Sequence, residues 1–187
     1  VEGPLSVMYG TDALAGVINL ITKKTATSWG LSYRIQEETV GREYAPFGNA
    51  GQHIRSLQGH RQWKRWTLES TLTQQQFGGW QGNSDSRRPA WLPKNQWFTQ
   101  GRLLYQGDKT NAWVRSQFLN EQIEAPGAVN ELTKITRDQS FITYRWMHQG
   151  QFRRHIHPNW TVQVDGSFTD YYRRTLTTQL NTETNIR

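Results

Sequence analysis

Long segments of alternating apolar and polar residues constrain the fold of this chain most strongly. The segment that begins at Trp160 is the clearest, because its apolar and small residues up to Phe168 occupy every second position and polar residues fill the rest. A period of two residues places the two sets on opposite faces of a β-strand. The same period predicts seven strands, at 28–39, 51–62, 66–77, 95–106, 111–123, 137–152 and from 160 onward.

The connections between these predicted strands alternate in length. The short connections are 63–65, 107–110 and 153–159, and the long ones are 40–50, 78–94 and 124–135. Outer-membrane barrels have short periplasmic turns and longer extracellular loops. The alternation therefore predicts an all-β fold, an antiparallel transmembrane β-barrel segment with its long loops outside. Four tryptophans beside the short turns are expected to form the periplasmic aromatic girdle: Trp63, Trp66, Trp113 and Trp160.

The composition agrees with a barrel wall. Hydrophobic residues make up only 35% of the chain and the mean hydropathy is −0.80, yet aromatic residues reach 12%. Disordered chains share the low hydropathy but contain few aromatic residues. Barrel strands alternate lipid-facing and lumen-facing residues, which keeps the average hydropathy low. The chain has no cysteine, so it has neither disulfides nor thiolate chemistry.

The net charge of +7 raises an alternative. A basic, tryptophan-rich chain could be a soluble β-rich domain that binds nucleic acid or carbohydrate. The basic residues form only short pairs, such as Arg87–Arg88 and Arg153–Arg154, rather than a continuous patch. We therefore expect no nucleic-acid partner.

Catalytic and metal-binding patterns are weak. Gly78, Gly79 and Gly82 are not followed by the Lys-Ser/Thr pair of a phosphate-binding loop. Two histidines, His155 and His157, could bind a metal together with His148, but no carboxylate is near them in the sequence. We expect no enzyme activity, no cofactor and no metal site.

The N-terminal 24 residues contain a second pattern of turn and strand signals. Its marker positions are Gly3, Pro4, Tyr9, Gly10, Gly16 and Asn19. The Gly-Pro pair predicts a turn, and Tyr-Gly predicts the end of a short helical turn. Gly16 begins a β-branched run that predicts a buried strand, in which Asn19 requires a polar partner.

This stretch closely resembles the end of the plug domain in TonB-dependent outer-membrane receptors. The match comprises Glu2-Gly3-Pro4, Tyr9-Gly10, Gly16-Val17-Ile18-Asn19 and Ile21-Thr22-Lys23-Lys24. Glu2 departs from the family, since many members place arginine before Gly-Pro. The resemblance implies that residues 1–25 end a plug domain and that 26–187 are the first strands of a bacterial outer-membrane barrel, about seven of roughly 22. It also implies that the signal peptide, the TonB box and most of the plug are missing.

The resemblance further implies import of a scarce nutrient, of the ferric siderophore, haem or cobalamin type. Plug rearrangement would be powered by the TonB–ExbB–ExbD complex, and the barrel would contact outer-membrane lipid and lipopolysaccharide. Aromatic and arginine side chains on the long loops are the candidates for contact with the nutrient: Tyr44, Phe47, Trp80, Arg87, Arg88 and Trp91. They could instead pack the loops or contact lipopolysaccharide. The lumen arginines Arg34, Arg102, Arg115 and Arg145 could attract an anionic ferric chelate or pair with plug carboxylates.

Overall fold

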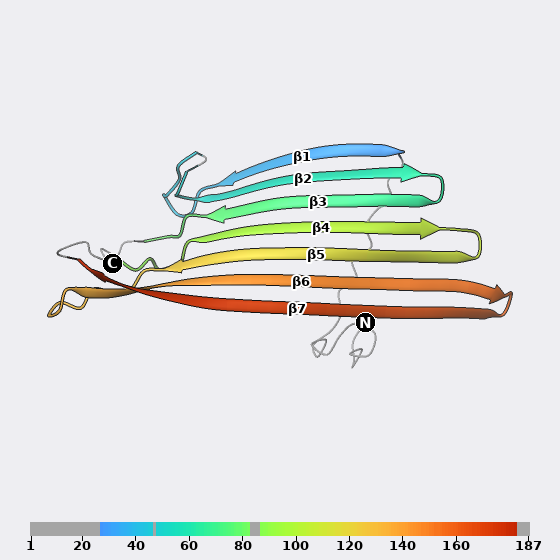
Figure 1. The fold of residues 1–187 in the computed structure, drawn as a ribbon. Coiled ribbons are helices and arrows are strands. Elements are labelled where there is room, and N and C mark those ends of the chain that lie inside the picture. Colours follow the sequence, from blue (N-terminus) through green and yellow to red (C-terminus); the bar gives the residue numbers. More distant parts are fainter. Residues whose placement is uncertain (1–26, 47, 83–86, 183–187) are drawn as a thin grey trace.

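The computed structural model describes residues 27–46, 48–82 and 87–182, which form one seven-stranded antiparallel sheet (Figure 1). Each strand pairs with its neighbours in the chain, in the order β1 to β7. The strands are β1 (Trp29–Glu38), β2 (Gln52–Trp63), β3 (Trp66–Phe77), β4 (Lys94–Gln106), β5 (Thr110–Ala125), β6 (Ile135–His157) and β7 (Trp160–Asn181). The predicted all-β, antiparallel fold is confirmed. The predicted plug segment, 1–25, lies outside the described residues.

The connection between β6 and β7 is shorter than predicted. The sequence predicts a turn over 153–159, but β6 continues to His157 and only residues 158 and 159 separate it from β7. Arg153 and Arg154 pair with Gln163 and Val162, so the ladder persists almost to the turn. The prediction of a turn at 155–157 is therefore wrong. The strand ends only at Pro158, which has no N–H to continue the ladder.

The connection between β2 and β3 is similarly tight. Trp63 belongs to β2 and pairs with Trp66 of β3, which leaves only Lys64 and Arg65 to reverse the chain. Lys64 has a φ of 51°, a left-handed conformation that a reversal of two residues requires.

The register separates the sheet into two faces. One row across the sheet is mainly apolar and joins Tyr33, Leu57, Leu72, Thr99, Phe118 and Trp146. The next row is mainly polar and joins Ser32, Gln58, Thr71, Gln100, Gln117 and Met147. We call these two sides the apolar face and the polar face. The period-two pattern of the sequence predicts both.

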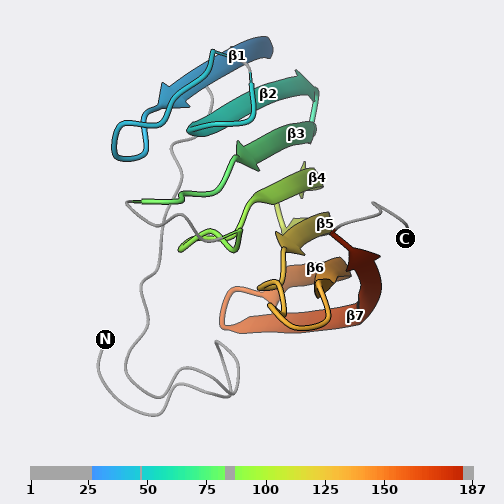
Figure 2. The ribbon, with the colours of Figure 1, turned by 90° about the vertical axis from the view of Figure 1, so that its left-hand side faces the viewer.

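The sheet is a single layer, with no second sheet or helix among the described residues (Figure 2). Ala125 is accordingly the one buried hydrophobic residue in the described part of the chain. Large side chains on the apolar face remain exposed, with Leu31 at 69% and Phe168 at 63%. An exposed apolar surface of this extent requires a covering, either protein or lipid.

The two ends of the sheet differ in the same way that the sequence predicts. The connections at 64–65, 107–109 and 158–159 lie at one end, and the loops 39–51, 78–93 and 126–134 lie at the other (Figure 1). We call these the short-turn end and the long-loop end. No helix among the described residues is long and apolar enough to cross a membrane.

Aromatic residues mark both limits of the apolar face. Trp66 and Tyr105 lie at the short-turn end with their ring centroids 4.9 Å apart, and Trp160 lies at the start of β7. Tyr172 lies twelve positions beyond Trp160 on the same face, past the single carboxylate of Asp170. Twelve residues span about 40 Å along a strand, or about 30 Å across a bilayer when the strand is tilted by about 40°.

Trp113 is an exception to the predicted girdle. Its register partners are Leu104 and Gln151, which place it on the polar face, and its indole Nε1 donates to the Gln151 side chain at 3.3 Å. The prediction for Trp113 is wrong because proximity to a turn does not decide the face. The parity of the position within the strand decides it.

Candidate functional site

Five of the six predicted ligand residues are described, and all five lie on loops at the long-loop end. Tyr44 is on the loop 39–51, while Trp80, Arg87, Arg88 and Trp91 are on the loop 78–93. Phe47 lies outside the described residues, as do the predicted plug residues Gly3, Pro4, Tyr9, Gly10, Gly16 and Asn19.

Trp80 and Trp91 close the loop 78–93 on itself. Their backbones form an isolated antiparallel bridge, in which Trp80 N donates to Trp91 O at 3.0 Å and Trp91 N donates to Trp80 O at 3.1 Å. Their ring centroids are 5.4 Å apart, and Phe77 lies 6.5 Å from Trp91. We call these three residues the aromatic cluster. Because Trp91 is 59% exposed, its ring is available to a ligand from outside.

Trp80 also joins this loop to the loop 39–51. Gly41 has a φ of 63°, and a Cβ at this position would lie 2.7 Å from Trp80 Nε1. The Glu43 carboxylate accepts a hydrogen bond from the backbone N of Gln81 at 3.2 Å. The aromatic cluster is therefore held from two loops, and Gly41 permits the close approach.

Arg87 is engaged in a clamp between loops. Its Nη2 donates to Asp138 Oδ2 at 2.6 Å, and its Nη1 donates to Asp138 Oδ1, Gly127 O and Thr136 Oγ1. The Thr136 hydroxyl, in a residue only 1% exposed, donates to Gly127 O at 2.9 Å. This clamp ties the loop 78–93 to the loop 126–134, so Arg87 can reach a ligand only if the clamp opens.

The clamp perturbs the ionisation of Asp138, which lies at the long-loop end beyond the aromatic limit of the apolar face. The hydrogen bonds from the Arg87 guanidinium, and less strongly the backbone N of Gly127, lower the pKa of Asp138 to about 2. The carboxylate therefore stays charged in the physiological range. No sequence pattern predicts this pair, since 51 positions separate its members.

A buried histidine anchors the loop 39–51. His53 is 1% exposed, its Nδ1 bonds the Glu37 carboxylate, and its Nε2 bonds Ala50 O at 3.2 Å. Together the two hydrogen bonds fix the orientation of the His53 ring between β1 and the loop. Neither residue is marked by the period-two pattern, because two facing polar residues are typical of any strand pair.

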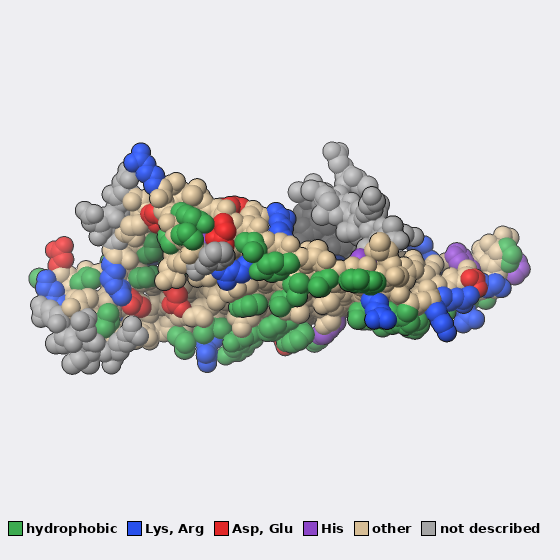
Figure 3. Space-filling view, turned by 90° about the horizontal axis from the view of Figure 1, so that it is seen from above, with side chains coloured by type: hydrophobic (Ala, Val, Ile, Leu, Met, Phe, Trp, Pro, Cys, Tyr) green, Lys and Arg blue, Asp and Glu red, His purple; other side chains and the backbone are tan. Residues whose placement is uncertain are grey.

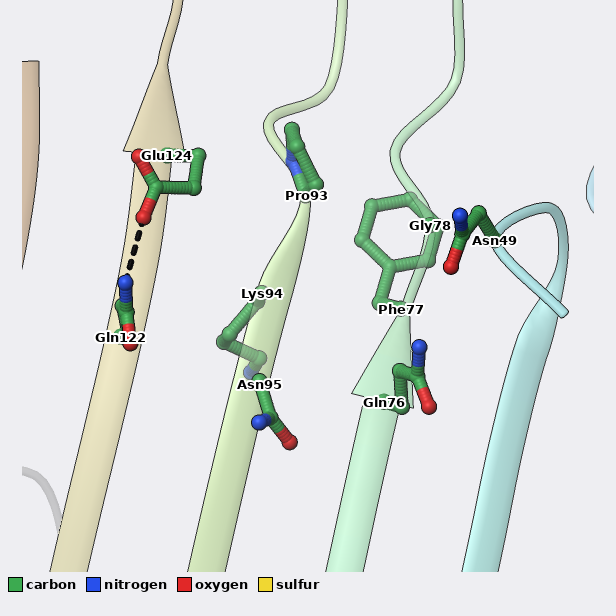
Figure 4. Close-up of a pocket in the computed structure, with 9 residues that line it drawn as sticks. All are labelled: Asn49, Gln76, Phe77, Gly78, Pro93, Lys94, Asn95, Gln122 and Glu124. Carbon is green, nitrogen blue, oxygen red and sulfur yellow. Dashed lines mark hydrogen bonds between the residues drawn. The ribbon is translucent and has the colours of Figure 1, made fainter.

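A separate hollow of about 400 Å³ lies at the long-loop end (Figure 4). Gln76, Asn95 and Gln122 are consecutive cross-strand neighbours, and Gln122 donates to Glu124 at 2.6 Å. The other residues that line the hollow are Asn49, Phe77, Gly78, Pro93 and Lys94. The lining is rich in amide donors and acceptors, and apart from Phe77 it does not include the aromatic cluster.

The four predicted lumen arginines all occupy the polar face. Arg102 and Arg115 face each other in the register, and their guanidinium carbons lie 5.3 and 5.8 Å from the ring centroid of Trp113. Arg102 reaches Glu69 at 3.5 Å, whereas Arg115 donates to the Gln149 side chain at 3.1 Å. Two facing cations with one carboxylate leave a net positive charge, which suits an anionic group.

The histidines at 148, 155 and 157 do not converge. His148 stacks on Trp146 and lies between it and Phe168 on the apolar face, while the His155 ring bonds the Thr161 hydroxyl on the polar face. Within the described residues, no group of three histidine, aspartate or glutamate side chains could hold a metal ion.

Comparison with known proteins gives a short match. No family model and no solved structure matches the chain. It is 43% identical over 49 residues to proteins named iron-regulated outer membrane virulence protein from two serotype O1 strains of Vibrio cholerae. The match covers 26% of this chain and 7% of each relative. The all-β sheet and the names of these relatives agree with the predicted location, and the chain is an outer-membrane protein.

Proposed function

We propose that this chain belongs to a TonB-dependent outer-membrane receptor that imports an iron-containing nutrient. The observation that carries this proposal is the single open sheet, with an exposed apolar face and an arginine-bearing polar face. A sheet of this kind fits the wall of a plugged barrel, where lipid covers one side and a polar lumen the other.

The edges of the sheet support a larger wall. β7 spans 22 residues, and its first 20 are all exposed because no strand covers its outer edge. A long unpaired edge invites pairing with another strand. Further strands would pair with the free edges of β1 and β7 and close a barrel of roughly 22 strands.

Iron is favoured as the cargo for two reasons. The relatives are named for regulation by iron, and production of an importer in response to iron fits iron uptake. Ferric chelates are commonly anionic, and the polar face carries an excess of arginine around Trp113. A ferric siderophore or haem fits this charge best, while cobalamin remains a third cargo of the same import class.

The aromatic cluster would make the first contact with the nutrient. Trp91 offers an exposed, rigid ring at the long-loop end, and Arg88 lies on the same loop. Energy would come from TonB–ExbB–ExbD through the plug that the N-terminal motif predicts. Arg87 would hold the loop in place rather than bind.

Uptake by cells that express the full-length gene product tests the proposal. A strain that lacks its own copy would receive a ferric siderophore, haem or cobalamin as the limiting nutrient, with and without a functional TonB. We expect uptake of one of them only with TonB, and about a tenfold loss of uptake at limiting nutrient in Trp91→Ala. Trp160→Ala, which removes an exposed tryptophan at the opposite end, is the matched control.

Two results would contradict the proposal. One is uptake that is independent of TonB for every nutrient. The other is a full-length product that is monomeric without detergent and shows no heat-dependent shift in gel migration, which would favour the soluble binding domain instead.

A further inference from the structure

The short-turn end of the sheet has few carboxylates beside its positive charges. At the short-turn end, four exposed cations make no side-chain hydrogen bond or ion pair with any described residue: Arg61, Lys64, Lys109 and Arg154. We call them the rim cations. In Figure 3, Lys and Arg side chains gather toward the right-hand, short-turn end with little acidic surface beside them, whereas basic and acidic side chains are mixed at the left-hand end.

The carboxylates nearest to the rim cations already have partners. Asp108 pairs with Arg65 at 2.7 Å, and Glu69 pairs with Arg102 at 3.5 Å. Asp165 accepts hydrogen bonds from Gln151 at 2.6 Å and Gln163 at 2.7 Å. The long-loop end has more carboxylates, among them Asp138, which pairs with Arg87.

Two of the rim cations rise from the apolar face itself. Arg61 is the register partner of both Trp29 and Leu68, and Arg154 is the partner of Val162. Lys64 and Lys109 lie in the adjacent turns. A long basic side chain beside apolar residues lays its stem along them and extends its charge to the water interface. The rim cations therefore lie at the level where the apolar covering ends.

We propose that the rim cations bind the phosphate groups of anionic phospholipids in the membrane leaflet at the short-turn end. Lipid is the partner that fits both observations, because it covers the apolar face and presents phosphates at its border. Guanidinium groups bind phosphate through paired hydrogen bonds, and each basic residue near an anionic surface adds about 1 kcal/mol of attraction. The inference rests on the proposed function only in that the sheet must span a membrane.

Lipid retention by the full-length protein tests this site. The protein would be reconstituted into nanodiscs of phosphatidylcholine, with or without phosphatidylglycerol, and bound lipid would be measured by native mass spectrometry. The test variant is R61Q/K64Q/K109Q/R154Q. The matched control is R42Q/K134Q/R137Q/R174Q, which removes the same charge from exposed positions nearer the long-loop end.

We expect the wild type and the control to retain phosphatidylglycerol in preference to phosphatidylcholine. The test variant should lose that preference by about fivefold for each cation that contacts lipid. Raising the salt concentration should weaken retention by the wild type but have little effect on the variant. The variant R61K/R154K keeps both charges and should retain most of the preference.

Equal retention by the wild type and the test variant would overturn the inference. Equal loss in the test and control variants would do so too, because it would show a general effect of net charge. If the quadruple variant fails to fold, the double variants R61Q/R154Q and K64Q/K109Q replace it. Retention equal to that of the wild type in both would overturn the inference. Failure of the wild type to insert into phosphatidylcholine, scored by heat-modifiable migration, would instead contradict the membrane-spanning sheet.

Discussion

The long-loop end and the short-turn end use the same kinds of residue in different ways. At the long-loop end, charged and aromatic side chains from different loops hold one another, as in the Arg87–Asp138 clamp and the His53–Glu37 pair. At the short-turn end, connections of two or three residues carry only one ion pair between them, Arg65–Asp108, and its side chains are exposed. Long loops must be ordered by tertiary contacts, whereas short turns are ordered by the strands that they join.

Chemical labelling gives the largest expected difference between the two ends. The chain contains no cysteine, so a single cysteine can be placed at Lys134 or at Lys109 without background. In intact cells that express the full-length protein, a membrane-impermeant maleimide should label Lys134→Cys and leave Lys109→Cys unlabelled. Both should react after the cells are broken. Labelling of Lys109→Cys alone in intact cells would reverse the proposed orientation.

Removal of His53 should be the most damaging single change at the long-loop end. His53→Ala would leave the Glu37 carboxylate without its hydrogen-bond partner, and an unsatisfied buried polar group costs about 1–3 kcal/mol. Hydrogen exchange of the amides in 39–51 should accelerate strongly while exchange near 64–65 stays unchanged. His60→Ala, which removes a less buried histidine of the same strand, is the control. Equal exchange in the two variants would refute the anchoring role of His53.

The two ends each contain an arginine–aspartate pair, Arg87–Asp138 in the clamp and Arg65–Asp108 between two short turns. Asp138→Asn should lower the free energy of unfolding by about 1–2 kcal/mol after allowance for solvent screening. Asp108→Asn should produce no measurable change, because the Asp108 side chain is 83% exposed. Denaturant titrations in detergent at neutral pH would compare the two variants. A larger loss for Asp108→Asn would invert the proposed difference between the ends.

The same clamp predicts an acid dependence. The folded pKa of Asp138 is about 2, below its usual 3.8, so the carboxylate stabilises the fold above pH 3.8 and loses that contribution as pH falls from 3.8 toward 2. Wild type should lose stability over this range more than Asp138→Asn does. If the free energy of unfolding fell equally with pH in the two proteins, the Asp138 carboxylate would not stabilise the fold through the clamp.

The smallest expected effect is at the short-turn aromatic pair. Trp66→Leu keeps an apolar side chain but removes the ring contact with Tyr105, which is worth about 0.5–1.5 kcal/mol beyond area burial. Trp91→Leu breaks a similar contact with Trp80 and should also lower nutrient uptake. A similar loss of uptake in both variants would remove the distinction between a structural and a binding aromatic pair.

The sequence predicted the strands well because its signals are local. Trp160 to Phe168 show their two faces by position alone, and β3 begins and ends where the period-two pattern predicts. The candidate site was predicted only in part. Tyr44, Trp80 and Trp91 lie at the long-loop end as expected, but Arg87 is engaged by Asp138, which the pattern did not single out.

The sequence by itself determined which residues form strands, which face each side chain occupies and which end carries the long loops. These properties follow from the two-residue period and from the order of elements along the chain. The tertiary structure alone decided the partners of Arg87 and His53 and how far β6 extends before its turn. Each of these depends on strand register, which brings together residues that no local pattern relates.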